Sequence, residues 1–229
     1  WASEPLASEY ADGIKPDKNY ITQLKTKLEK VIHEALSNTF DASVGTAVGK
    51  CGASLGVGGN RRVKNGICDD TVNVISVKDK TGTVRACLLN YTLHPTYLHS
   101  ENELVSADYP GYVRRFLSYA QPEAVFLFAQ GASGDQSSRY HRTEQSFEEA
   151  ARVGTTLGVR MNECIINIEY TDKIDLDVKT HEIDNLPLKE FPTIDLAEKL
   201  QAKAIEYYEA QKNKDYITLR NAELAMFGA

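Results

Sequence analysis

The sequence of 229 residues lacks the features that mark several protein classes. Its longest unbroken apolar run, Ala124 to Ala129, is far shorter than the roughly 20 residues that a membrane-spanning helix needs. Basic residues form no stripe along the sequence and the net charge is −6, so we expect no nucleic-acid partner. No internal repeat or low-complexity tract is present. The remaining composition, 42% hydrophobic and 25% charged, is that of a folded globular protein.

Cysteine is scarce and widely spaced. Cys51, Cys68, Cys87 and Cys164 form neither a Cys-x-x-Cys pair nor a dense disulfide framework. They are typical of small buried hydrophobic residues, and they leave the cellular compartment open. The sequence starts at Trp1 without an initiating Met, which predicts a piece of a longer protein.

Hydrophobic periodicity predicts an α/β fold with one or more mixed β-sheets, flanking helices and a C-terminal helical segment. We expect one domain over residues 1–185, with residues 186–229 as a helical extension of it. The predicted helices cover residues 16–38, 110–120, 147–168, 194–212 and 215–227, the third of them behind a capping box of Ser146 and Glu149. The predicted strands are an antiparallel hairpin over 72–77 and 83–92, a central buried strand over 124–129 and an amphipathic strand over 174–183.

Two of these strands end in residues that can do chemistry. His94 follows the hairpin and precedes Pro95, which fixes the chain direction. A rigid imidazole is a good zinc ligand, although a catalytic zinc needs about three protein ligands. From spacing alone, a histidine that is merely hydrogen-bonded at a strand end is the favoured interpretation of His94, and His99 is a weaker candidate still.

The second candidate is the loop after residue 129, which carries Gly131, Ser133, Asp135, Ser137 and Ser138. Hydroxyls and backbone amides in such a loop can bind or attack a carbonyl group. The loop matches neither the Gly-x-Ser-x-Gly elbow of α/β-hydrolases nor a phosphate-binding P-loop. A plain turn rich in glycine and serine explains its composition equally well.

Two further side chains complete the candidate set. Arg61, in Asn60-Arg61-Arg62, can hold a carbonyl or carboxylate group by a two-pronged contact, although most paired arginines are surface charge. Asp108 can orient the loop after His94, or it can be a plain first-turn residue of the helix that follows.

Taken in order, four segments of the sequence resemble motifs of the neutral/alkaline non-lysosomal ceramidase family. They are Asn60-Arg61, Asn90 to Thr96, Ser106 to Tyr112 and Phe128 to Ser137. The resemblance is specific over residues 42–168. It implies part of a zinc-containing catalytic domain that hydrolyses the amide bond of ceramide, or of a similar N-acyl lipid, to a fatty acid and an amine.

The resemblance also implies roles for individual residues. His94 falls at a zinc ligand, Ser137 at the active-site serine and Arg61 at a substrate-contacting arginine, with Asp108 and Asp135 in support. The family's His-x-His segment does not occur in this sequence, and Ser138 replaces a frequent proline. The remaining ligands would lie in parts of the domain outside this sequence, and the 229 residues alone should bind zinc poorly. A lipid substrate, association with a membrane surface and an extracellular or cell-envelope location follow from the same resemblance.

Two other functions remain open at this point. One is a non-catalytic module that uses the glycine-rich loops to bind a lipid or a glycan. The other is a metal-free serine hydrolase in which His94 acts as the base for Ser137.

Overall fold

The protein is described here by a computed structural model that covers residues 18–98, 102–185, 193–214 and 222. The chain divides into two compact units, Trp1–Leu176 and Asp177–Ala229. The predicted domain boundary at residue 185 stays a prediction.

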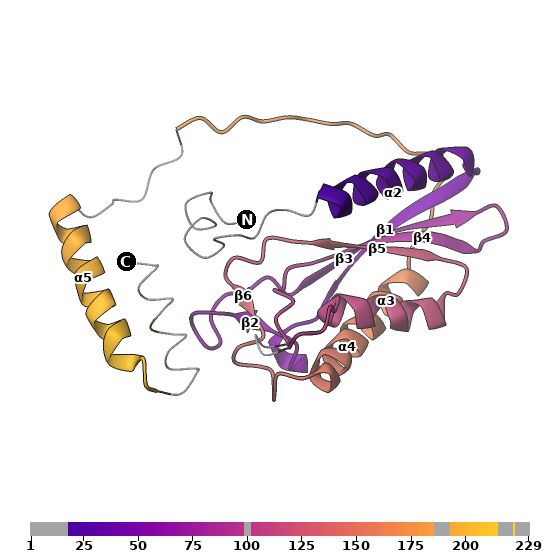
Figure 1. Ribbon diagram of the computed structural model, residues 1–229. Coiled ribbons are helices and arrows are strands. Elements are labelled where there is room, and N and C mark those ends of the chain that lie inside the picture. Colours follow the sequence, from indigo (N-terminus) through magenta and orange to yellow (C-terminus); the bar gives the residue numbers. More distant parts are fainter. Residues whose placement is uncertain (1–17, 99–101, 186–192, 215–221, 223–229) are drawn as a thin grey trace. The chain divides into compact units, whose positions relative to one another are not determined.

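A four-stranded mixed sheet forms the centre of the first unit (Figure 1). Its strands are β1 (Ala42–Lys50), β3 (Thr71–Asp79), β4 (Val84–Tyr91) and β5 (Val125–Gln130), in the spatial order β1-β3-β4-β5. The first three are antiparallel, and β4 and β5 are parallel. The predicted hairpin is confirmed as β3 and β4. Gly82 in its turn has a φ of 84°, which glycine adopts without strain.

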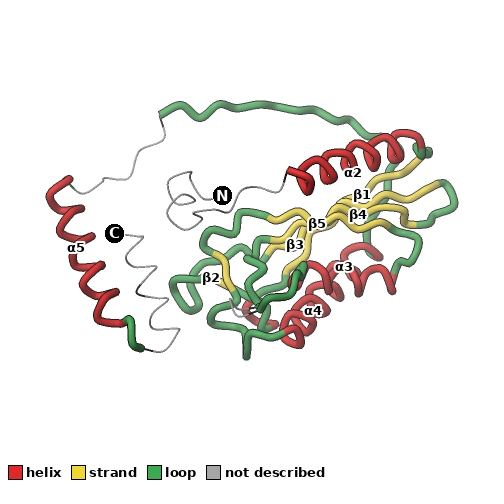
Figure 2. The backbone as a smooth tube through the Cα atoms, viewed as in Figure 1, coloured by secondary structure: helices red, strands yellow, loops and turns green. Residues whose placement is uncertain are grey.

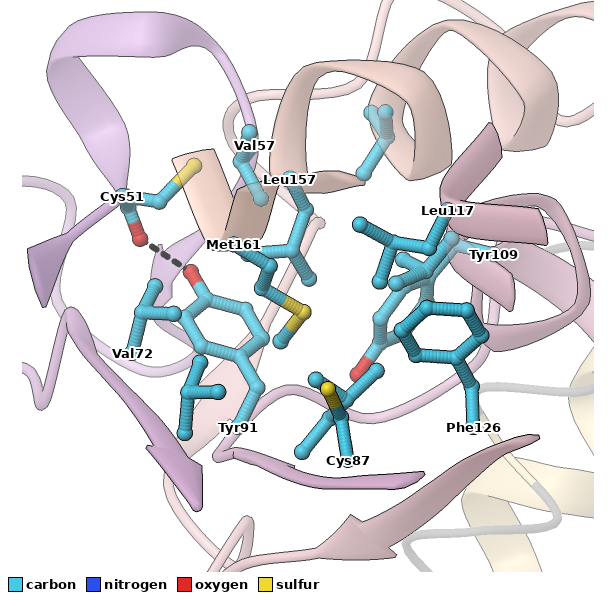
Figure 3. Packing of buried hydrophobic residues seen from close by; sticks show 14 of the residues in the cluster. Cys51, Val57, Val72, Cys87, Tyr91, Tyr109, Leu117, Phe126, Leu157 and Met161 are labelled. Atoms are coloured by element: carbon cyan, nitrogen blue, oxygen red, sulfur yellow. Dashed lines mark hydrogen bonds between the residues drawn. The ribbon is translucent and has the colours of Figure 1, made fainter. Parts of the chain in front are cut away.

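Two helices cover one face of this sheet (Figures 1 and 2). They are α3 (Asp108–Ala120) and α4 (Phe147–Ile166), and both were predicted. Gly154 of α4 lets them approach closely, since a Cβ atom at this position would lie 2.5 Å from the Cβ atom of Tyr112. Leu117, Leu157 and Met161 project from the helices into the core between helices and sheet (Figure 3).

Three buried tyrosines pack edge to face inside this core. The ring of Tyr109 lies 6.5 Å from that of Tyr91 and 5.9 Å from that of Tyr97, between ring centroids. Each hydroxyl donates to a backbone carbonyl: Tyr91 to Cys51 (Figure 3), Tyr97 to Val57, and Tyr109 to Leu93 at 2.7 Å. Burial raises the pKa of all three hydroxyls above the usual range, so they stay protonated and act as donors.

The prediction that the cysteines are buried is confirmed for two of the four. All four are free, Cys51 and Cys87 are buried, and Cys68 and Cys164 are half-buried. Burial raises the pKa of the Cys51 thiol to about 11, so this sulfur is inert at neutral pH.

The predicted strand over 124–129 is confirmed as β5, but its predicted central and buried position is wrong, and the predicted strand over 174–183 is not present. β5 is an edge strand of the described sheet, because it pairs with β4 alone, and its Val125 and Leu127 side chains are 61% and 59% exposed. The segment 173–185 contains no strand, and all its side chains are exposed. Its alternating pattern suits a strand, but no described strand pairs with it, and the single bridge between Val44 and Thr171 lies before it.

The remaining described helices, α2 (Lys18–Ser37) and α5 (Ile194–Gln211), agree with the predictions from the sequence. α2 is amphipathic as predicted, yet none of its residues is buried. In the second unit, α5 confirms the C-terminal helical segment, whereas the predicted helix over 215–227 lies outside the described residues. The α/β fold class is confirmed. Within the described residues, no helix has the length and apolar character needed to cross a membrane.

Candidate functional site

The two candidate strand ends lie at the same edge of the sheet. Because β4 and β5 are parallel, the segments that follow them leave the sheet on one side. The backbone amide of Gly131 donates to the carbonyl of Tyr91 at 2.9 Å and joins the two exits. Beyond this link, the Nδ1 atom of His94 lies 3.5 Å from the Oγ atom of Ser133. The imidazole after β4 thus contacts the serine-rich loop after β5.

A short two-stranded ribbon adds Arg61 and Ser137 to this edge. It consists of β2 (Gly59–Asn60) and β6 (Gln136–Ser137), with Gly59 opposite Ser137. The amide of Arg61 donates to the carbonyl of Asp135 at 2.7 Å and continues the pairing. Residues about 75 positions apart in the sequence are therefore neighbours, and the ribbon leads directly into the loop that contacts His94.

Ser137 is held in a defined position. The residue is only 7% exposed, and its Oγ atom accepts a hydrogen bond from the amide of Arg139 at 3.1 Å. The hydroxyl proton is thereby left to be donated to another group. Asp135 is exposed, and its carboxylate accepts from the side-chain amide of Gln136 at 2.8 Å.

Asp108 fixes the loop that follows His94. Its carboxylate is buried and accepts from the amides of Tyr97 at 2.9 Å, Leu98 at 3.2 Å and Tyr109 at 2.6 Å. Its backbone has a φ of 51°, a left-handed conformation that aspartate tolerates better than most residues. The carboxylate therefore joins the His94 loop to the first turn of α3, and this contact explains why a buried aspartate begins that helix.

The tyrosine cluster supports the same site from inside the core. The hydroxyl of Tyr109 donates a hydrogen bond to the carbonyl of Leu93, the residue before His94. The hydroxyl of Tyr97 donates a hydrogen bond to the carbonyl of Val57, two residues before β2. The packed rings thus tie the positions of the His94 loop and the β2–β6 ribbon to each other.

His141, which no sequence motif indicated, lies beside this ribbon. Its Nε2 atom is 2.7 Å from the place where a Cβ atom of Gly59 would be. Directly opposed residues of an antiparallel pair point their side chains to the same face, so the imidazole occupies the face of the ribbon that carries the Ser137 side chain. Burial and, to a lesser extent, the charge of Lys64 lower the pKa of His141. The one feature of the sequence that relates to His141 is the glycine at position 59, because the absence of a side chain there leaves room for the imidazole.

The described residues do not form a zinc site by themselves. Within them, no three or more His, Cys, Asp or Glu side chains lie close enough together to hold a metal ion. His94 contributes one imidazole where about three protein ligands are needed. His99 lies outside the described residues.

The fold resembles that of solved neutral ceramidases. The chain superposes on a ceramidase "complexed with C2" with a TM-score of 0.51 and 17% identity, and on the neutral ceramidase of Pseudomonas aeruginosa with a TM-score of 0.51 and 19% identity. Each match covers 59% of this chain and 24% of the ceramidase. No family model matches the sequence, and no curated protein does so either. The resemblance seen in the sequence motifs is thus confirmed at the level of the fold.

Proposed function

We propose that the protein is an amidohydrolase that cleaves the amide bond of an N-acyl substrate, such as a ceramide-like lipid, into a fatty acid and an amine. The observation that carries the proposal is that His94, Ser137 and Arg61 lie on connected loops at one edge of the sheet. The likeness to the ceramidase fold supports the same class of reaction. In this proposal the 229 residues are part of a larger catalytic domain that acts at or near a membrane surface, outside the cell or in its envelope.

Amide hydrolysis adds water across the C–N bond, so that the acyl carbon gains a hydroxyl group and the nitrogen gains a proton. Ser137 would attack the carbonyl carbon or position the attacking water, since its Oγ atom already accepts one bond and has its proton to donate. Arg61 would stabilise the negative charge that develops on the carbonyl oxygen. Asp108 and Asp135 would hold the loops that carry these groups.

Zinc is the cofactor that this proposal includes, with His94 as one ligand. Because the described residues offer a single imidazole at this edge, the other ligands would come from elsewhere in the protein. We therefore expect the isolated 229-residue chain to bind zinc weakly in a calorimetric titration. Tight, stoichiometric and tetrahedral binding within this chain would contradict the expectation.

Activity of the complete protein tests the proposed reaction. We expect it to release fatty acid from an N-acyl amine, to lose this activity after treatment with a chelator and to regain it when zinc is added back. Activity that survives chelation would contradict the zinc enzyme and support a metal-free serine hydrolase instead. Binding of the acyl amine without any turnover would contradict an enzymatic function and support a lipid-binding or glycan-binding module.

A further inference from the structure

Two separate basic segments of the sequence flank the β2–β6 ribbon that carries Ser137. One follows β2 and contains Arg61, Arg62 and Lys64, and the other follows β6 and contains Arg139 and Arg142. Because β2 and β6 are antiparallel, the two segments leave the ribbon at opposite ends, and the hydroxyl of Tyr140 links them by donating to the carbonyl of Arg62 at 3.3 Å. A chain with a net charge of −6 thus carries positive charge on both segments around this ribbon.

Arg142 forms hydrogen bonds to two loops of the site. Its Nη1 atom donates to the carbonyl of Thr96 at 3.1 Å and to the Oγ atom of Ser138 at 3.4 Å. Thr96 is two residues beyond His94, and Ser138 is next to Ser137. The half-buried guanidinium therefore spans the two loops that carry the proposed active groups, and a guanidinium has further N–H donors for a ligand.

Among the residues that the structure describes, the basic segment after β6 has no carboxylate that balances its charge. Within the described residues, no carboxylate lies within ion-pair distance of Arg139 or Arg142, whereas Arg85, Arg152 and Arg160 each have such a partner. Burial, followed by the charge of Arg139, lowers the pKa of Arg142. The two buried carboxylates of the described residues are already engaged, Asp108 by three backbone amides and Glu149 by Arg152 and the amide of Thr143. A half-buried guanidinium with a like charge beside it is stabilised when an anion joins them.

We propose that Arg139 and Arg142 form a subsite beside Ser137 for an anionic group of the substrate. The inference rests on the proposed amidohydrolase function and narrows its substrate class. The preferred substrate would be an N-acyl compound whose amine part carries a carboxylate, sulfonate, sulfate or phosphate, for example an N-acyl amino acid. An uncharged N-acyl amine would lack this contact.

Binding of short, soluble probes to the 229-residue chain tests the subsite without any need for turnover. N-octanoylglycine carries a carboxylate and N-octanoyltaurine a sulfonate, while N-octanoylethanolamine has the same acyl chain and no charge. We expect at least one anionic probe to bind about tenfold more tightly than the uncharged one in calorimetry at low salt, because charge-assisted hydrogen bonds are the strongest. The preference should shrink as salt is added.

Variants decide which residues cause the preference. Arg139→Gln, at an exposed position, and Arg142→Gln should each reduce it, and Arg142→Lys should retain part of it. Arg114→Gln, at an exposed position of α3, is the matched control and should leave it unchanged. Circular dichroism confirms that each variant is folded, and Arg139→Gln remains informative if Arg142→Gln unfolds. Equal binding of all three probes, or a preference that persists in Arg139→Gln and in folded Arg142→Gln, would overturn the subsite. A preserved preference in a complete protein that hydrolyses no amide would overturn only the proposed reaction.

Discussion

Replacement of Ser137 by alanine in the complete protein is expected to lower the rate of amide hydrolysis about 10²- to 10⁴-fold, the range in which loss of a positioned reacting group falls. The hydroxyl is held by the amide of Arg139 and lies on the ribbon that carries Arg61, so its removal takes away a group that no neighbour replaces at the same position. The measurement is the steady-state release of fatty acid. His94→Ala should cause a loss of similar size.

The control is Ser54→Ala, at an exposed position of the short helix η1 (Ala53–Leu55), which should retain full activity. Zinc content is measured in the same samples, because His94→Ala is expected to reduce it while Ser137→Ala is not. If turnover and zinc content were unchanged in both variants, the assignment of these two residues would be rejected.

Glu149→Gln should lower the free energy of unfolding by about 2 kcal/mol at neutral pH. The Glu149 carboxylate is 3% exposed and accepts from Arg152 at 2.7 Å and from the amide of Thr143 at 3.0 Å. Arg152 in turn donates to the carbonyl of Gly56 at 2.8 Å, which ties the start of α4 to the turn before β2. These contacts, with the Arg152 hydrogen bond first, lower the pKa of Glu149 from 4.5 to about 2.

The sign of the pH dependence follows from this lowered pKa. The stabilisation is fully present above pH 4.5, the ordinary value, and is lost as the pH falls from 4.5 towards 2. Urea unfolding at several pH values should therefore show the largest difference between wild type and Glu149→Gln near pH 7 and a small one near pH 2. Glu148→Gln, at the exposed neighbouring position, is the control and should change stability by less than about 0.5 kcal/mol. An equal effect of both substitutions would refute the role of the buried contacts.

Local patterns were enough to predict most helices and the hairpin. The Ser146 cap, for example, accepts from the amide of Glu149 at 3.1 Å as the capping box requires. The side chain of Glu149 does not complete the box, however, because Arg152 and Thr143 engage it instead. Such competition depends on residues that only the folded chain brings near, so the sequence motif predicted half of the interaction.

The wrong predictions have the same origin. The apolar strand 124–129 suits a central position, but its neighbours in the sheet are determined by pairing with β4 and not by its own composition. The alternation in 174–183 is compatible with a strand, but a strand needs a partner. The order of strands and the presence of partners are non-local properties.

The candidate site was predictable to a similar extent. His94, Ser137 and Arg61 could be proposed because motifs and strand ends are local features of the sequence. The approach of His141 to Gly59, and the bridge of Arg142 between Thr96 and Ser138, arise from the β2–β6 ribbon. A ribbon with only two residues in each strand gives no periodic signal.

The most direct test of the central claim is the position of a bound product. Crystals of the complete protein, soaked with zinc and with the fatty acid released from an N-acyl amine, would locate both. We expect the metal to lie on His94 and the carboxylate of the product to lie between Ser137 and Arg61. A fatty acid bound elsewhere, for example in the hollow lined by Val44, Thr46 and Lys173, with no metal at His94, would contradict this expectation.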